Sequence, residues 1–298
     1  MRIFRVGLAT VVVMLVTASM LGNGCAAPAT EPIVPESASK PNNAPVISSL
    51  TANPSAVLYG DSSTLTCIAT DPDYDPIEYI WSVSEGTITG SGKEVTWVAP
   101  NKDGNFNITI IVKDNRGDQT TGNVMVTVSA PIKTITIEPI AAETGTVNQT
   151  NATDYSRTRA GDNAQNISYR AFWSFDISKF GGKNIQNASL KFTTGSITGK
   201  PFSYQLPYGL GGLLLWKTNY SAELPGFDCV GSMLSSNTGR LLEPPDVVDV
   251  TTDIKLLTSY DISRFQVEAL FDRTSNGSST AEWIEWSSVV LEITYSDR

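Results

Sequence analysis

The sequence predicts an all-β protein in which two β-sandwich domains follow an N-terminal leader and a tether. Short runs of β-branched and aromatic residues alternate with clusters of turn-forming residues through residues 44–298. No long segment of this region repeats apolar residues at the helical period. A chain of 298 residues is long enough for about two domains of this class. We place these domains at residues 44–131 and 132–298.

The N-terminal segment has the pattern of an export signal. A basic head precedes an apolar run over residues 6–21, which is marginal in length for a membrane-spanning helix, and Cys25 follows. Residues 1–24 resemble a prokaryotic lipoprotein signal peptide. The resemblance implies lipidation of Cys25, membrane lipid as a partner and a place in the cell envelope. Ordinary secretion and an uncleaved anchor are the alternatives, because Asn23 departs from the usual motif.

Residues 25–43 form the predicted tether between the leader and the first domain. The segment is rich in proline and small polar residues and has no apolar period. Such sequences stay disordered or adopt extended polyproline-like conformations. We therefore expect a spacer that holds the first domain away from a membrane surface.

The composition excludes several classes of protein. The chain contains no histidine, which is the commonest general base and the commonest metal ligand. Zinc hydrolases and serine–histidine triads are therefore excluded. The formal net charge of −9, with no basic stretch beyond the leader, argues against nucleic acid as a partner. Besides Cys25 the chain has only Cys67 and Cys229, and we expect two buried, unpaired thiols.

The first domain has the strand spacing of a sandwich. Within residues 105–113, Phe106 and alternate residues after it are apolar, which is the period expected of a strand with one buried face. No helix is expected in this domain. The predicted strands cover residues 46–53, 63–70, 77–84, 94–98, 105–113 and 122–128.

Three motifs of the first domain carry a resemblance to a known family. They are Ala69-Thr70-Asp71-Pro72-Asp73, Tyr79-Ile80-Trp81 and Val95-Thr96-Trp97-Val98. With them, residues 44–131 resemble an immunoglobulin-like domain of the polycystic-kidney-disease kind. The resemblance implies that Trp81 fills the core between the two sheets. Cys67 lies where an antibody-type disulfide would begin, but the partner strand carries Ile110 and Val112, so hydrophobic packing replaces the bridge.

Five aspartates form the most chemically distinctive group of the first domain. Alternate carboxylates on a proline-containing loop can converge on a hard cation, and calcium is the obvious candidate for such oxygen ligands. In a sandwich of this topology, the two loops that carry the aspartates emerge from the same end. The alternative is that these residues are turn formers with solvated charges. The predicted ligands are Asp71, Asp73, Asp75, Asp114 and Asp118.

The second domain is predicted to be a larger sandwich that ends in a strand of alternating apolar residues at 289–295. Its characteristic segments are Arg170-Ala171-Phe172-Trp173-Ser174-Phe175-Asp176-Ile177 and Ile185-Gln186-Asn187-Ala188-Ser189-Leu190. These segments look like the jelly-roll domains known as DNRLRE domains and their disaggregatase-related relatives. The resemblance implies an extracellular module similar to carbohydrate-binding domains.

Carbohydrate binding requires aromatic rings that stand out of a β surface, because sugar faces stack on them. Trp283 and Trp286 lie three positions apart on one strand, so they face opposite sides and at most one is exposed. We expect Trp173 and Trp286 in the core. The candidates for a ligand site are Tyr204, Tyr208, Trp216, Tyr220 and Trp283. The alternative is that most of these rings are also core residues.

We expect no catalytic residues in this chain. A glycosidase needs two carboxylates that face each other across a cleft, and Glu282, Glu285 and Asp249 keep this alternative open. The sequence predicts a non-catalytic cell-surface lipoprotein whose second sandwich binds glycan or another envelope component, with the first sandwich as a stalk. The alternatives are a purely structural envelope protein and an accessory subunit of a polysaccharide-degrading system.

Overall fold

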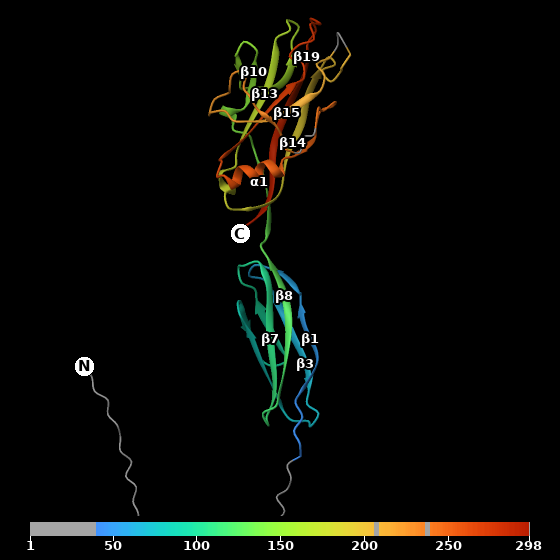
Figure 1. Ribbon diagram of the computed structural model, residues 1–298, viewed down its shortest axis with the longest axis vertical. Helices are drawn as coiled ribbons and strands as arrows, with labels where there is room; N and C mark the ends of the chain where they lie inside the picture. The colour runs from blue at the N-terminus through green and yellow to red at the C-terminus, as the bar shows by residue number, and fades with distance from the viewer. Residues whose placement is uncertain (1–39, 206–208, 236–238, 298) are drawn as a thin grey trace, which may run out of the picture. The chain divides into compact units, whose positions relative to one another are not determined.

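Strands make up most of the described chain. The computed structural model describes residues 40–205, 209–235 and 239–297 (Figure 1). Within these ranges the helical elements are one short α-helix and two 3-10 turns, so the predicted all-β fold is confirmed. None of the helices described there is long and apolar enough to cross a membrane. The predicted leader, Cys25 and Tyr208 lie outside the described residues.

The first sandwich consists of two four-stranded sheets. Its strands are β1 (Val46–Asn53), β2 (Ala56–Leu58), β3 (Ser62–Thr70), β4 (Ile77–Val83), β5 (Thr87–Thr89), β6 (Glu94–Val98), β7 (Gly104–Asp114) and β8 (Gln119–Ser129). One sheet has the order β1-β3-β6-β5 and the other the order β2-β8-β7-β4. β1 pairs with β3 in the antiparallel sense, whereas β2 pairs with β8 in parallel. The chain therefore changes sheets between β1 and β2, as immunoglobulin-like folds do.

The core of the first sandwich is centred on Trp97. On β7, alternate residues from Phe106 to Val112 are buried, which confirms the predicted alternation. Trp97 on β6 is fully buried, and its Nε1 donates to the carbonyl oxygen of Glu85 at 3.1 Å. Trp81 on β4 packs against the same core but is only partly buried. Trp97 is thus the fully buried tryptophan, and Trp81 contributes to the core from its margin.

Both cysteines of the described chain are free thiols. Cys67 on β3 is fully buried, and burial raises the pKa of its thiol. Cys229, in the second sandwich, is only half-buried, which corrects the expectation of two buried thiols. Its Sγ lies 2.9 Å from Oγ1 of Thr218. No disulfide therefore joins the two sheets of the first sandwich in the described part of the chain.

The second sandwich is formed by a single curled sheet of eleven strands. Its main path has the order β16-β15-β18-β13-β12-β19-β14-β17, while β10 joins β11 and β13 and β9 joins β19. The strands are β9 (Ile132–Ile137), β10 (Gly145–Asn148), β11 (Thr153–Asp154), β12 (Thr158–Asp162), β13 (Ser168–Asp176), β14 (Asn184–Thr198), β15 (Leu213–Thr218), β16 (Ser232–Met233), β17 (Val247–Asp249), β18 (Arg264–Phe271) and β19 (Glu282–Ser296). The helical elements are η1 (Ala141–Glu143), η2 (Ser178–Phe180) and α1 (Thr251–Ser259).

The curled sheet closes over one large apolar core. β19 pairs with β14 along most of its length, and β13 pairs with β18. β12 connects these two pairs because it bonds to both β13 and β19. Trp173 on β13 and Trp286 on β19 are buried between them, and their rings meet edge to face with centroids 5.1 Å apart. The predicted core positions of these two tryptophans are confirmed.

The sequence does not predict α1, which lies across one end of the second sandwich (Figure 1). Ile254 on α1 is buried in the main core. Asp253 is fully buried and accepts hydrogen bonds from Nζ of Lys217 at 2.8 Å and from Oγ of Ser235 at 2.9 Å. A helix of nine residues is too short for a helical period to stand out in the sequence. The three-residue strands β2 and β5 are missed for the same reason.

Replacement of Trp97 should remove the largest fully buried ring of the first sandwich. We expect Trp97→Ala to lower the free energy of unfolding by about 3–5 kcal/mol, because the surrounding strands cannot fill the cavity. Trp81→Ala is the matched comparison and should cost less, since this ring is only partly buried. Urea denaturation followed by circular dichroism measures both. If Trp81→Ala lowered the free energy of unfolding by as much or more, Trp81 would be the more important core residue.

Candidate functional site

The strands β13, β18 and β15 carry side chains on two faces that differ in character. Alternate residues, among them Trp173 and Val267, point into the main core. The residues between them point the other way, and Phe172, Glu268 and Trp216 lie side by side there in register. We call this second face the outer face. It carries the candidate site.

A smaller apolar cluster covers part of the outer face. Phe172 packs there with Val147 and Phe227, and the ring of Tyr220 meets Phe172 edge to face at 5.7 Å between centroids. Phe227 and Tyr220 come from the loop between β15 and β16. This loop therefore packs over one part of the outer face and buries it, and Tyr220 is one of the residues that cover it.

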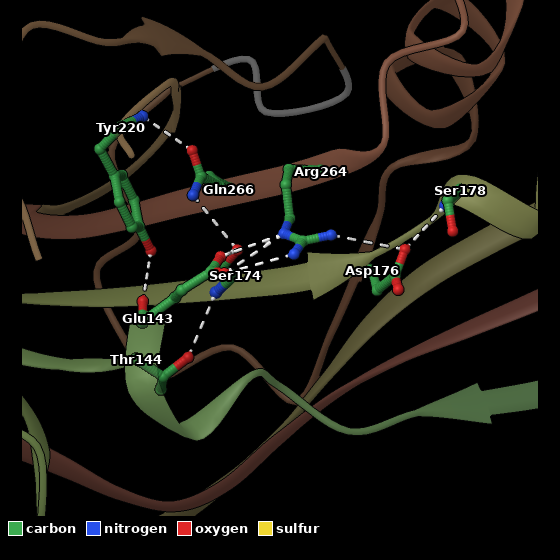
Figure 2. Close-up of polar contacts among 8 residues, drawn as sticks. All are labelled: Glu143, Thr144, Ser174, Asp176, Ser178, Tyr220, Arg264 and Gln266. Carbon is green, nitrogen blue, oxygen red and sulfur yellow. Dashed lines mark hydrogen bonds and ion pairs between the residues drawn. The ribbon is translucent and has the colours of Figure 1, made fainter. Parts of the chain in front are cut away.

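A buried hydrogen-bond network extends the sealed region (Figure 2). Glu143, in η1, accepts hydrogen bonds from Oγ of Ser174 at 2.6 Å and from Nε of Arg264 at 3.2 Å. The hydroxyl of Tyr220 donates to the carbonyl oxygen of Glu143 at 2.8 Å, and its backbone N–H donates to Oε1 of Gln266 at 2.7 Å. Burial raises the pKa of the Tyr220 phenol. These contacts and its burial leave neither the ring nor the hydroxyl of Tyr220 available to a ligand. We therefore exclude Tyr220 from the candidate ligand site.

The same network explains the Phe-Asp-Ile-Ser motif at the end of β13. Oδ1 of Asp176 accepts the backbone N–H of Ser178 at 2.9 Å and lies 3.6 Å from Nη1 of Arg264 (Figure 2). The hydrogen bonds from Ser178 and the charge of Arg264 lower the pKa of this carboxyl. The motif thus ends the strand and anchors Arg264.

A buried ion pair lies beside Trp216. Glu268 is fully buried, and its Oε1 accepts from Nη1 of Arg170 at 2.9 Å. Burial raises the pKa of Glu268 to about 7, against the opposing effect of Arg170. The guanidinium of Arg170 lies 4.3 Å from the ring centroid of Phe227. Oε2 of Glu268 and Nε1 of Trp216 are buried with no hydrogen-bond partner in the described part of the chain.

Trp216 marks the open part of the outer face. The ring is half-exposed and lines a pocket of about 420 Å³. Leu214, Met233, Arg240 and Asp272 line the same pocket. Since Nε1 of Trp216 is buried, the ring presents its carbon surface to the pocket. The pocket therefore combines an aromatic wall with charged polar groups.

The polar wall of this pocket is the pair formed by Asp272 and Arg240. Oδ2 of Asp272 accepts from Nε of Arg240 at 2.6 Å and from the hydroxyl of Tyr204 at 3.1 Å. A Cβ at Gly212 would lie 2.4 Å from Cβ of Arg240 and 2.7 Å from the Tyr204 hydroxyl, so glycine allows both to approach. Tyr204 thus contacts the carboxylate that lines the pocket together with Trp216.

Trp283 has a different environment. It is half-exposed on β19, and the guanidinium of Arg159 lies 5.1 Å from its ring centroid. The same guanidinium lies 4.1 Å from the ring centroid of Tyr169. Arg159 therefore stacks on both rings and occupies a face of Trp283, which makes Trp283 a poorer platform for a ligand than Trp216.

Sequence reasoning does not find Leu214, Met233, Arg240 or Asp272. Arg240 and Asp272 are far apart in the chain. Leu213 brings their neighbours together, because it pairs with Phe271 of β18 and forms a bridge with Leu241. One signal was available: the run of leucines that leads into Trp216 alternates between the core and the outer face, with Leu214 and Trp216 on the outer side.

Two of the three carboxylates that would serve a glycosidase, Glu282 and Asp249, form hydrogen bonds that stabilise the fold. Glu282 is buried, and its Oε2 accepts from the backbone N–H of Gly209 at 2.8 Å and from Nδ2 of Asn276 at 2.6 Å. Burial and the neighbouring charge of Asp162 raise its pKa. Asp249 accepts the backbone N–H of Thr251 at 2.8 Å. These contacts hold loops and a helix start in place.

The five predicted calcium ligands lie on two loops of the first sandwich. Asp71, Asp73 and Asp75, between β3 and β4, place oxygens within 4.8 Å of one another. Asp114 and Asp118, at the loop between β7 and β8, both accept from Nδ2 of Asn42, at 2.8 and 2.9 Å. Burial of Asp114 opposes its ionisation, but hydrogen bonds from Asn42 and from the loop backbone outweigh this effect and lower its pKa. The side chain of Arg116 approaches Asp75 to 3.7 Å, which connects the two loops.

The raised pKa of Glu268 gives the stability of the second sandwich a defined pH dependence. In the folded chain Glu268 keeps its proton up to about pH 7, whereas the unfolded chain loses it near the ordinary value of 4.5. The folded state binds more protons between these values, so stability falls as pH rises through this window and levels off above it. We expect Glu268→Gln to remove this loss, a gain relative to wild type of up to roughly 3 kcal/mol between about pH 4 and about pH 8.

Urea denaturation of both proteins across this pH range measures the difference. Glu138→Gln is the matched control, because Glu138 is exposed. Its stability should run parallel to that of the wild type. A parallel curve for Glu268→Gln would show that the pKa of Glu268 is the same in the folded and the unfolded chain.

Comparisons with known proteins identify the first sandwich. Residues 42–127 match the bacterial Ig domain family, in agreement with the two-sheet arrangement of β1 to β8. The curated proteins give no significant match. A solved nucleoside hydrolase-related protein from Saccharophagus degradans, associated with carbohydrate metabolism, is 20% identical over 30% of this chain, with a TM-score of 0.25. The match covers only 26% of that protein.

Two further solved structures align with longer parts of the chain. A structure described as a carbohydrate-binding module of the β-sandwich superfamily is 11% identical over 87% of this chain and 94% of its own, with a TM-score of 0.27. The adhesin InvE of Yersinia pseudotuberculosis is 13% identical over 80% of this chain and 57% of its own, with a TM-score of 0.23. The family match and the strand topology together establish that residues 42–127 form a bacterial immunoglobulin-like domain.

Proposed function

We propose that this chain is a non-catalytic surface protein whose second sandwich binds polysaccharide at the Trp216 pocket. The observation that carries the proposal is the half-exposed Trp216 ring beside the Asp272–Arg240 pair. Export and anchoring through Cys25 belong to the same proposal and rest on the sequence of the leader. The resemblance of the second sandwich to DNRLRE domains points in the same direction.

The pocket has the two kinds of surface that a sugar ring requires. The carbon face of Trp216 can stack on the C–H face of a pyranose ring, which places apolar area against apolar area. The guanidinium of Arg240 can donate to ring hydroxyls, and the Asp272 carboxylate can accept from them. Because Tyr204 holds Asp272 by a hydrogen bond, the acceptor is positioned before a ligand arrives.

Charge favours an uncharged polysaccharide over an anionic one. Arg240 and Asp272 neutralise each other at 2.6 Å. The chain as a whole has a formal net charge of −9, which repels polyanions at low salt. We therefore propose a neutral glycan as the ligand and assign the bacterial Ig domain, residues 42–127, the role of a spacer between the membrane tether and the binding module.

The test is retention of the exported chain, without its leader, on insoluble and immobilised polysaccharides. We expect retention on at least one neutral polysaccharide, and we expect Trp216→Ala to weaken it by about tenfold or more, as loss of a central aromatic anchor does. Trp283→Ala is the matched control and should bind as the wild type does, because Arg159 already covers that ring. Pull-down and isothermal titration with soluble oligosaccharides measure the effect.

Each outcome of this test separates the candidate functions. No retention on any glycan would leave the purely structural envelope protein as the better account. Retention that Trp283→Ala abolishes and Trp216→Ala spares would move the site to β19. Retention on anionic polymers alone would overturn the proposed ligand class while keeping a binding function.

A further inference from the structure

We propose that the acidic end of the first sandwich is a calcium site, and that Asn42, which precedes β1, supplies one of its ligands. The proposal is independent of the glycan pocket, because it concerns only the bacterial Ig domain. Its consequence is that a cation would fix the point where the tether enters the domain.

Three oxygen atoms at this end are buried and have no hydrogen-bond partner in the described part of the chain. They are Oδ1 of Asn42, Oδ2 of Asp71 and Oδ2 of Asp75. Asp71 is only 8% exposed. A buried acceptor without a partner is costly, and native proteins rarely leave one unsatisfied. All three atoms are acceptors, so a cation is a suitable partner for them, whereas a further carbonyl or carboxylate is not.

The spacing of the carboxylates suits calcium. One oxygen each from Asp71, Asp73 and Asp75 lies within 4.8 Å of the others. Oxygens bound to one Ca²⁺ at roughly 2.3–2.6 Å are separated by at most about 5 Å. Mg²⁺ binds at roughly 2.0–2.1 Å and demands near-ideal octahedral geometry, which loops from separate segments are less able to supply.

Turn formation explains the role of one carboxylate oxygen of Asp71 but not of the other. Oδ1 of Asp71 accepts the backbone N–H groups of Asp73 at 2.8 Å and Asp75 at 3.1 Å, as a turn-forming aspartate does. The same role leaves Oδ2 of Asp71 without a function. Nη1 of Arg116 is 3.7 Å from Oδ2 of Asp75, which is beyond hydrogen-bond distance. The turn and Arg116 therefore leave Oδ2 of Asp71 and Oδ2 of Asp75 without a hydrogen-bond partner in the described part of the chain.

Two consecutive asparagines connect this end to the segment before β1. Nδ2 of Asn42 donates to Asp114 and Asp118, which directs the amide nitrogen to the β7–β8 loop. The backbone N–H and Nδ2 of Asn43 donate to Oδ2 of Asp73 at 2.8 and 2.9 Å. A cation held by Asn42, Asp71 and Asp75 would thus join three segments that are distant in the sequence.

The experiment titrates the exported chain, freed of metal by a chelator, with CaCl₂ in a calorimeter and in thermal unfolding. We expect one Ca²⁺ per chain with a dissociation constant on the order of 10⁻⁴–10⁻³ M, the range of extracellular modules, and weaker binding of Mg²⁺. Hydrogen–deuterium exchange should slow in residues 40–46 when Ca²⁺ is bound. No calcium binding, or binding without slower exchange in this segment, would overturn the proposal.

Asp71→Asn is the decisive variant. Its amide oxygen can keep the two turn hydrogen bonds while its nitrogen replaces Oδ2, so we expect calcium affinity to fall by about tenfold or more. Asp154→Asn is the matched control, because Oδ1 of Asp154 accepts the N–H of Ser156 in a similar turn of the second sandwich. Asn42→Ala is a second variant, at a residue that lies outside the strands. We expect it to weaken calcium binding as well. Unchanged affinity in Asp71→Asn, or in Asn42→Ala if Asp71→Asn does not fold, would refute the site.

Discussion

Burial of both faces of β13 and β18 is the constraint on which the second sandwich depends. Seven of the eight residues of β18 are buried, so the side chains that point away from the main core are covered as well. Polar residues on that side, such as Glu268 and Gln266, need fixed partners, because buried polar groups without them are costly. The η1 turn and the β15–β16 loop supply these partners and the apolar cover. At Trp216 the outer face stays open and forms one wall of a pocket.

The sequence predicts the fold where a strand is long enough to show its period. The strands expected at residues 46–53 and 94–98 have the bounds of β1 and β6, and the alternation on β7 separates buried from exposed residues as expected. Three-residue strands and the nine-residue α1 are too short for a period to show. Trp97, and not Trp81, is the fully buried ring. This difference depends on how the two sheets pack against each other, which the residue pattern of a single strand does not show.

The site is harder to predict because its contacts are distant in the sequence. Tyr204, Trp216 and Tyr220 have the same aromatic character in the sequence, yet Tyr220 is sealed under a loop while Trp216 lines a pocket. The difference comes from the partners of each ring: Glu143 and Gln266 hold Tyr220, and Asp272 holds Tyr204. The Asp71 loop is the opposite case. Its carboxylates are close in the sequence, so their proximity follows from local geometry. The contacts of Asn42 with the β7–β8 loop form only when the domain folds, so the sequence does not predict them.

The buried Cys67 thiol has a consequence for the maturation of the protein. A thiol at the centre of a sandwich, with its pKa raised by burial, stays protonated and out of reach of oxidants. The bacterial Ig domain therefore acquires its native state without a disulfide and without the oxidoreductases that exported proteins often require. Its folded form is the same in reducing and oxidising compartments, so the domain is insensitive to the redox state of the surroundings it enters.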